Sequence, residues 1–143
     1  MEIYQISVFL ENQAGKLSEV TNLLAENKID LRAINIAESS DYGILRMITN
    51  NSEKAIEVLR EKGFIVNCTA VLAVSVPDRP GGLANLLNIL AGEKFDVEYM
   101  YSIFGQPNGL AYMILRVDDI DEVRKVLESD EIHTADAAEL GIC

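Results

Sequence analysis

The sequence repeats itself at an offset of 66 positions, without a gap, over about 48 residues. The repeat contains eleven identities, spread over positions that fit turns, helices and strands. Convergence of two amphipathic patterns would match hydrophobic residues, whereas this repeat also matches Gly and Asp positions. The chain is therefore predicted to contain two copies of one folding unit. The matched pairs are Val8/Val74, Gly15/Gly81, Leu17/Leu83, Asn22/Asn88, Leu24/Leu90, Ala25/Ala91, Lys28/Lys94, Asp30/Asp96, Gly43/Gly109, Met47/Met113 and Ile48/Ile114.

The composition is that of a folded, acidic protein. The 143 residues are 49% hydrophobic and carry a formal net charge of −11, which argues against intrinsic disorder. The excess of acid also argues against direct contact with nucleic acid or an anionic membrane, because binding phosphates requires clustered Lys and Arg. No apolar run approaches the roughly 20 residues that span a bilayer. With only Cys68 and Cys143, the chain is expected to be cytoplasmic.

Both copies show the same order of hydrophobic patterns. In the first copy, alternation of Ile6, Val8 and Leu10 predicts a strand, and a helix with Leu17, Val20 and Leu24 on one face follows it. Further strands are expected at 31–37, 44–49 and 64–69, and in the second copy at 72–76, 97–104, 110–117 and near the C-terminus. The second helix of each copy is expected to be capped by Ser52, or by Asp118 or Asp119.

This order, βαββαβ, occurs twice and predicts the α+β class. Right-handed crossovers place both helices of a unit on one face of a four-stranded antiparallel sheet, which is the ferredoxin-like arrangement. The expected domains are residues 1–68 and 69–143. A unit of about 70 residues has a small core and an open sheet edge, so a homodimer of the whole chain is expected.

The loop after the first strand of the second copy has the chemistry of a zwitterion receptor. Pro80 fixes φ near the start of the following helix, and Gly81 and Gly82 allow close approach to the backbone. The unpaired N–H groups and positive dipole end of the helix suit a carboxylate, and Asp78 can accept from an ammonium group. In the alternative interpretation, Pro-Gly-Gly only makes a tight turn that Asp78 caps.

Residues 76–83, Val-Pro-Asp-Arg-Pro-Gly-Gly-Leu, resemble the signature of ACT domains, and Lys-Phe-Asp-Val at 94–97 agrees with it. The resemblance covers essentially the whole chain as two copies, although residues 11–17 of the first copy lack Arg-Pro. It implies a small ligand, usually an amino acid, at the seam between two units. One unit would contribute its first strand–helix loop and its neighbour the second strand. It also implies regulation of an associated enzyme or transcription factor.

The candidate ligand-binding residues follow from this resemblance. Alternatively, Asp30 and Asp96 are turn residues that bond their own backbone, and the candidates of the second strands form an exposed sheet face. Arg79 alternatively makes a weak solvated ion pair. The first copy either binds weakly, binds another ligand, or serves as a scaffold. The candidates are Asn12, Gln13, Ala14, Gly15, Leu17, Asp30, Asn35, Asp78, Arg79, Pro80, Gly81, Gly82, Leu83, Asp96, Tyr101 and Ser102.

An enzyme is the least supported class. His133 is the only histidine, and Cys68 and Cys143 have no nearby base and are expected to be buried or incidental. The glycines fit neither the GxGxxG nor the GxxxxGK[ST] motif of nucleotide-binding proteins. No cofactor, metal or catalytic residue is therefore expected. The favoured function is a non-catalytic amino-acid sensor that regulates a partner. The alternative is a ligand-independent regulatory subunit or adaptor that docks onto an enzyme.

Overall fold

The computed structural model describes residues 2–11, 13–38, 41–104 and 109–142. The chain divides into two compact units. The first unit consists of Tyr4–Thr69, and the residues after Leu140 are counted with it. The second consists of Ala70–Leu140, and the residues up to Ile3 are counted with it. Each unit has its own hydrophobic core.

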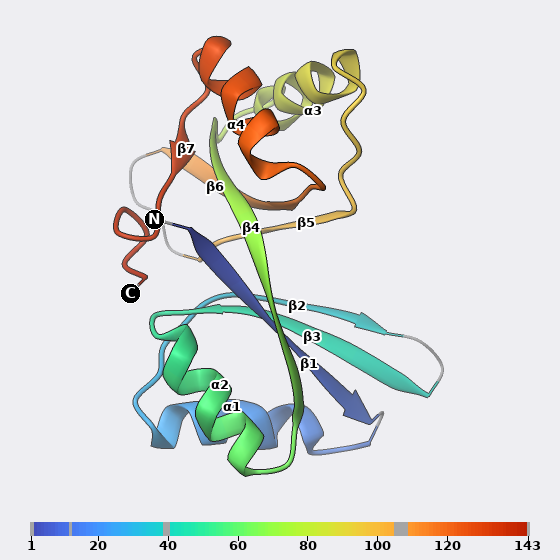
Figure 1. Ribbon diagram of the computed structural model, residues 1–143, viewed down its shortest axis with the longest axis vertical. Coiled ribbons are helices and arrows are strands. Elements are labelled where there is room, and N and C mark those ends of the chain that lie inside the picture. The colour runs from blue at the N-terminus through green and yellow to red at the C-terminus, as the bar shows by residue number, and fades with distance from the viewer. Residues whose placement is uncertain (1, 12, 39–40, 105–108, 143) are drawn as a thin grey trace. The chain divides into compact units, whose positions relative to one another are not determined.

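The first unit folds as a four-stranded sheet with two helices on one face (Figure 1). Its strand order is β4-β1-β3-β2. The alternating residues Ile6 and Val8 of β1 pack against Val20 and Leu24 of α1, which explains the period of two in the strand and of nearly four in the helix. The elements are β1 (Ile3–Glu11), α1 (Lys16–Glu26), β2 (Leu31–Glu38), β3 (Tyr42–Thr49), α2 (Ser52–Glu61) and the beginning of β4 (Ile65–Pro77).

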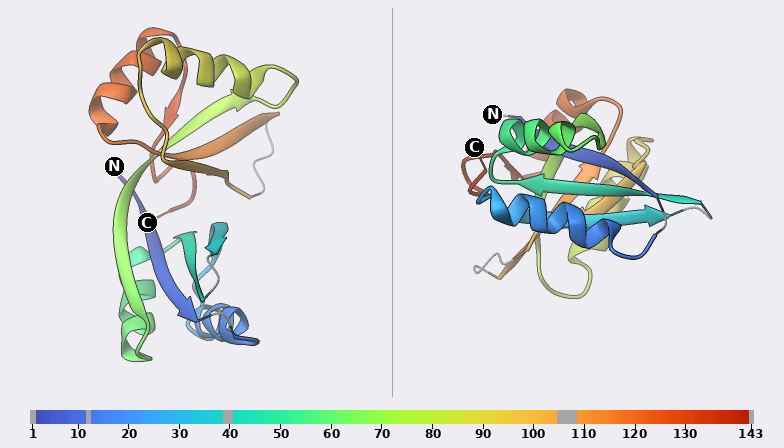
Figure 2. Two further views of the ribbon diagram at one scale, coloured as in Figure 1. Left: turned by 90° about the vertical axis from the view of Figure 1, so that its right-hand side faces the viewer. Right: turned by 90° about the horizontal axis from the view of Figure 1, so that it is seen from below.

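The second unit repeats this arrangement with the strand order β7-β4-β6-β5. Figures 1 and 2 show α3 and α4 on the same face of these strands. Leu72 and Val74 of β4 pack with Leu86 and Leu90 of α3. The predicted α+β class with two ferredoxin-like units is therefore confirmed. The remaining elements are α3 (Gly82–Gly92), β5 (Tyr99–Ser102), β6 (Leu110–Arg116), α4 (Ile120–Ser129) and β7 (Thr134–Ala135).

Three strands differ from the sequence prediction. The strands expected at 64–69 and 72–76 are one continuous strand, β4. The strand expected at 97–104 is shorter, because β5 pairs with β6 only from Tyr99 opposite Arg116 to Ser102 opposite Met113. The closing strand β7 has two residues, which pair with Ala73 and Val74.

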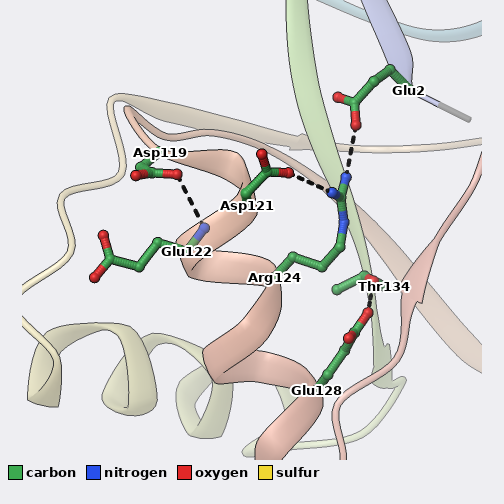
Figure 3. Close-up of polar contacts among 7 residues, drawn as sticks. All are labelled: Glu2, Asp119, Asp121, Glu122, Arg124, Glu128 and Thr134. Atoms are coloured by element: carbon green, nitrogen blue, oxygen red, sulfur yellow. Dashed lines mark hydrogen bonds and ion pairs between the residues drawn. The ribbon is translucent and has the colours of Figure 1, made fainter.

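The N-caps of the second helices were predicted correctly in one copy and wrongly in the other. Asp119 Oδ1 accepts from the Glu122 N–H at 3.1 Å, as Figure 3 shows. In the first copy the cap is Asn51, whose Oδ1 accepts from the Lys54 N–H at 3.1 Å, and Ser52 is the first helical residue. The error is physically small, because Asn and Ser are both strong N-cap residues and stand side by side here.

Glu2, the second residue of the chain, makes an ion pair with α4 of the second unit. Arg124 of α4 lies between two carboxylates, with Nη2 3.1 Å from Glu2 Oε1 and Nη1 3.0 Å from Asp121 Oδ1 (Figure 3). In the same helix, Glu128 Oε1 accepts from the Thr134 hydroxyl at 3.3 Å, which links α4 to β7. Partly exposed pairs of this kind contribute little stability.

The repeat extends to unusual backbone conformations. Gly15 and Gly81 have φ of 86° and 89°, and Lys28 and Lys94 have φ of 58° and 60°. A third pair, Gly63 (φ 87°) and Glu131 (φ 61°), follows the second helices. Left-handed backbone favours glycine, since a Cβ costs roughly 1–2 kcal/mol there. The second copy therefore has a strained Glu where the first copy has Gly.

We expect Glu131→Gly to stabilise the protein by about 0.5–1 kcal/mol, because it removes the Cβ strain and also a carboxylate at a helix C-terminus. The measurement is urea unfolding followed by circular dichroism. Gly63→Ala is the mirror control. Nothing lies within 4 Å of the Cβ that this substitution adds, so only the left-handed φ of 87° disfavours alanine there. We expect the free energy of unfolding to fall by about 1 kcal/mol. A Glu131→Gly protein less stable than the parent would contradict this account of the strain.

Candidate functional site

The loop of the second unit is a tight turn from β4 into α3. The Arg79 N–H donates to the Pro77 carbonyl at 2.9 Å, and the Gly82 N–H donates to the Arg79 carbonyl at 3.1 Å. The Asp78 N–H donates to the Gly109 carbonyl at 3.1 Å. Gly81, at φ 89°, is the N-cap of α3. Backbone bonds and the left-handed glycine thus fix the loop.

Gly82 is required by the close approach of the helix to the strand end. A Cβ added at Gly82 would lie 2.1 Å from the Pro77 carbonyl oxygen, which is part of the backbone and cannot swing away. The position that matches it in the first unit is Lys16. This contact between the first residue of α3 and the end of β4 is therefore a property of the second loop.

The start of α3 presents free hydrogen-bond donors. Gly81 provides no side-chain cap, and the N–H groups of Leu83 and Ala84 have no partner among the described residues. Arg79 is exposed and makes no ion pair within the described part of the chain. These donors and the positive end of the helix suit an anion. A cavity of about 190 Å³ adjoins them, lined by Pro77, Arg79, Pro80, Gly81, Gly82 and Asn85.

The loop differs from the prediction in the role of Asp78. Asp78 does not cap α3, so the alternative interpretation of this residue is wrong. Its exposed side chain also does not line the cavity. Pro80 lies near the start of the helix as expected, directly before the N-cap Gly81. Asn85 lines the cavity but was not predicted, although its place three residues after Gly82 on the same helix is the signal that identifies it.

The loop of the first unit is built differently. Gln13, Ala14 and Gly15 are exposed, and Gln13 Nε2 donates to Glu11 Oε2 at 3.0 Å. Leu17, which was expected on the buried face of α1, is 38% exposed. The candidate Asn12 lies outside the described residues.

A larger cavity, of about 380 Å³, lies beside the first loop. None of the candidate residues that the structure describes lines it, and part of its wall comes from the turn between α2 and β4, about 50 residues further along the chain. The lining residues are Phe9, Leu10, Glu11, Lys16, Glu19, Tyr42, Lys62, Gly63, Phe64 and Ile65.

The candidates that follow the first helices have separate surroundings. Asp30 Oδ2 lies 3.5 Å from Arg32 Nη1, so its carboxylate makes an ion pair instead of bonding its own backbone. Asp30 and Asp96 lie past the C-termini of α1 and α3, each of eleven residues, whereas the loops lie at the N-termini. At 1.5 Å per residue the ends are roughly 16 Å apart. A single unit therefore does not bring these aspartates to its own loop.

The candidates of the second strands are partly engaged by their own unit. Asn35 Oδ1 accepts from Arg46 Nη1 at 3.5 Å. The ring of Tyr101 stacks on Tyr99, with centroids 6.4 Å apart. Ser102 is exposed. Of these three residues, only Ser102 is exposed without a described side-chain contact, as expected for an exposed sheet face.

The reactive side chains have ordinary surroundings. Cys68 is exposed, which fits the incidental one of the two expected alternatives, and desolvation by its neighbours raises the pKa of its thiol despite the opposing charge of Arg60. A raised pKa disfavours the nucleophilic thiolate. His133 Nε2 lies 2.6 Å from Glu139 Oε2 at an exposed position. Within 2–11, 13–38, 41–104 and 109–142, no three His, Cys, Asp or Glu residues are arranged to hold a metal ion. None of the described helices has the length and apolarity to span a membrane.

The chain consists of two ferredoxin-like units in tandem, and each turns from its first strand into its first helix through a left-handed glycine. Residues 1–141 match the ACT domain pair family, and the chain belongs to this family. The resemblance seen in the loop of the second unit is thereby confirmed. Family membership assigns the chain a regulatory, small-molecule-sensing role.

Solved structures of related proteins cover nearly the whole chain. Protein BT0572 from Bacteroides thetaiotaomicron is 40% identical and has a TM-score of 0.91, over 99% of this chain and 96% of that one. The regulatory subunit of aspartate kinase from Thermus thermophilus, in a ligand-free form, is 16% identical with a TM-score of 0.64, over 90% and 93% of the two chains. The second likeness shows the shared fold. The sequence matches no protein with a curated description.

Proposed function

We propose that this protein is a non-catalytic regulator that binds a free amino acid at the loop of its second unit and controls a partner enzyme or transcription regulator. The observation that carries the proposal is the combination, in one loop, of open amides at Leu83 and Ala84, an unpaired Arg79 and an adjoining cavity. The ligand carboxylate would accept from these groups, and Asp78 in the same turn would accept from the ammonium group.

The size of the cavity favours a small side chain. At about 190 Å³ it is smaller than the roughly 300–1,000 Å³ of common ligand pockets. Arg79 and Pro80 are exposed, so we propose that a second copy of the chain covers the bound amino acid. The fold shared with a regulatory subunit of aspartate kinase supports control of an enzyme of amino-acid metabolism.

Thermal unfolding in the presence of each of the twenty amino acids tests this function. A ligand at 100 times its Kd stabilises the folded state by about 2.7 kcal/mol. For a chain of this length, that corresponds to a rise in Tm on the order of 5–10 °C. We expect such a rise with one or a few small amino acids. No rise with any of them would reject the sensor and favour a ligand-independent adaptor.

Two aspartate variants show whether the shift comes from this loop. Asp78→Asn removes the proposed partner of the ammonium group and should weaken binding about tenfold. Asp118→Asn makes the same change at an exposed residue of the second unit that lies outside the loop from Pro77 to Gly82, and should leave binding unchanged. Equal effects of the two variants would remove Asp78 from the site.

A further inference from the structure

The helix α3 has no charged side chain, unlike the other three described helices. Each of α1, α2 and α4 contains charged residues of both signs. The comparison with α1 is direct, because the repeat aligns the two helices residue by residue. The lack of charge is therefore specific to the copy of this helix in the second unit. The charged residues of α1 are Lys16, Glu19 and Glu26, and the matching residues of α3 are Gly82, Asn85 and Gly92.

The exposed side of α3 is formed by small and amide side chains. Leu86 and Leu90 are buried in the core of the second unit, and the opposite side of the helix is exposed. Leu87 and Ile89 are half-buried and flank the exposed side, so its edges are apolar. Side chains this short allow a second helix to pack at an axial distance of roughly 8–10 Å. We define the neutral face of α3 by its exposed residues Ala84, Asn85, Asn88, Ala91 and Gly92.

The neighbouring helix α4 belongs to the most acidic part of the chain. Residues 118–139 contain nine Asp or Glu residues but only two cations, Arg124 and Lys125. This segment accounts for −7 of the net charge of −11. Two copies of such a segment repel each other, so self-association is disfavoured at α4 and favoured where the surface carries no charge. The neutral face of α3 meets that condition.

Two-fold symmetry requires a residue that tolerates its own copy. In a two-fold pair, each residue near the axis lies beside the same residue of the other chain. A charged side chain would meet its own charge there, whereas an Asn amide has donors and an acceptor and can pair with itself. Asn88 is in the middle of the neutral face, with Ala84 and Ala91 one turn away on either side. Its amide has no hydrogen-bond partner among the described residues.

We propose that two copies of the chain form a dimer in which their α3 helices pack antiparallel through the neutral faces. The two-fold axis passes beside Asn88, and the two Asn88 amides exchange hydrogen bonds. The antiparallel arrangement also brings opposite ends of the two helix dipoles together. It sets the end of α3 in one copy beside the loop at Pro80 in the other. The inference thus extends the proposed function by naming the surface that holds the second copy, and the pairing is expected without any amino acid.

Sedimentation velocity of the full chain, without added amino acid, tests this pairing. One pair of short helices is a small interface, so we expect a Kd on the order of micromolar. Asn88→Glu introduces a charge at the axis and should raise this Kd at least about tenfold. Glu has a higher helix propensity than Asn, so the variant should keep its fold, which circular dichroism checks. Asn22→Glu makes the same change at the matching exposed position of α1 and should leave the Kd unchanged.

A charge swap tests the two-fold symmetry. Asn88→Lys should also raise the Kd at least about tenfold, because a lysine then faces a lysine. An equimolar mixture of the Asn88→Glu and Asn88→Lys proteins should form the dimer again, since opposite charges meet at the axis. Damage to the fold by either substitution would not be reversed by mixing.

Three results would overturn the inference. They are a chain that stays monomeric up to about 500 µM, far above the expected Kd, a dimer that Asn88→Glu weakens no more than Asn22→Glu, and a mixture of the charge variants that stays monomeric. The Tm experiment with the twenty amino acids separates this inference from the proposed function. A dimer without any rise in Tm would keep the pairing and reject the sensor. A rise in Tm in a monomeric chain would reject the pairing and keep the sensor.

Discussion

Gly82→Ala is expected to destabilise the second unit by about 3 kcal/mol or more, because overpacking against rigid backbone exceeds the usual cost of an inserted methyl group. The new Cβ would lie 2.1 Å from the Pro77 carbonyl oxygen, a distance that real atoms do not reach. Relief requires moving the first turn of α3 away from the end of β4. Such a movement also displaces the N–H groups of Leu83 and Ala84, so ligand binding at the loop should be lost as well.

Two other glycines provide matched controls for this substitution, and urea unfolding of all three variants gives the comparison. At Gly81 the added Cβ meets nothing within 4 Å, so only the left-handed φ of 89° disfavours alanine. We expect Gly81→Ala to lower the free energy of unfolding by roughly 1–2 kcal/mol. At Gly92, at the end of α3, the Cβ has open space and a gain of up to about 1 kcal/mol is expected. A Gly82→Ala protein as stable as the Gly92→Ala protein would show that helix and strand do not make this contact.

Leu24→Ala and Leu90→Ala should each lower the free energy of unfolding by about 2–5 kcal/mol. These residues are matched by the repeat, each is only 1% exposed, and each belongs to the core of its own unit. Both also lie at helix ends, where their carbonyl groups accept from Ile29 and Phe95 at 2.9 Å. Removal of either side chain leaves a cavity that the surrounding helix and strands fill only in part.

Leu17→Ala is the control for this pair, because Leu17 is 38% exposed and should lose less than about 1 kcal/mol. Denaturant unfolding followed by circular dichroism measures all three. Equal losses of unfolding free energy in Leu17→Ala and Leu24→Ala would contradict the orientation of α1, in which Leu24 is buried against the sheet and Leu17 is exposed.

The architecture was predictable because it is encoded locally and twice. Identities at an offset of 66 define two units, and the same repeat governs the backbone at Gly15 and Gly81 and at Lys28 and Lys94. The errors concern features that short-range pattern does not determine. The continuity of β4 across Thr69 and Ala70 is one of these, because β4 pairs with β1 in the first unit and with β6 in the second.

The two cavities also differ in how far the sequence alone could identify them. The loop from Pro77 to Gly82 is a contiguous segment whose Pro and Gly residues specify its geometry, so it was identified directly. The cavity of the first unit joins Phe9 and Lys16 to Lys62 and Ile65, which only folding brings together. No spacing in the sequence relates these positions, so the structure was required to find it.

A crystal structure of the protein with the amino acid that raises its Tm most tests the central claim directly. The account predicts electron density for that amino acid at the start of α3, with a carboxylate oxygen about 2.7–3.2 Å from the N–H of Leu83 or Ala84. An amino acid bound elsewhere, with these two amides contacting only water or the protein itself at saturating ligand, would contradict it.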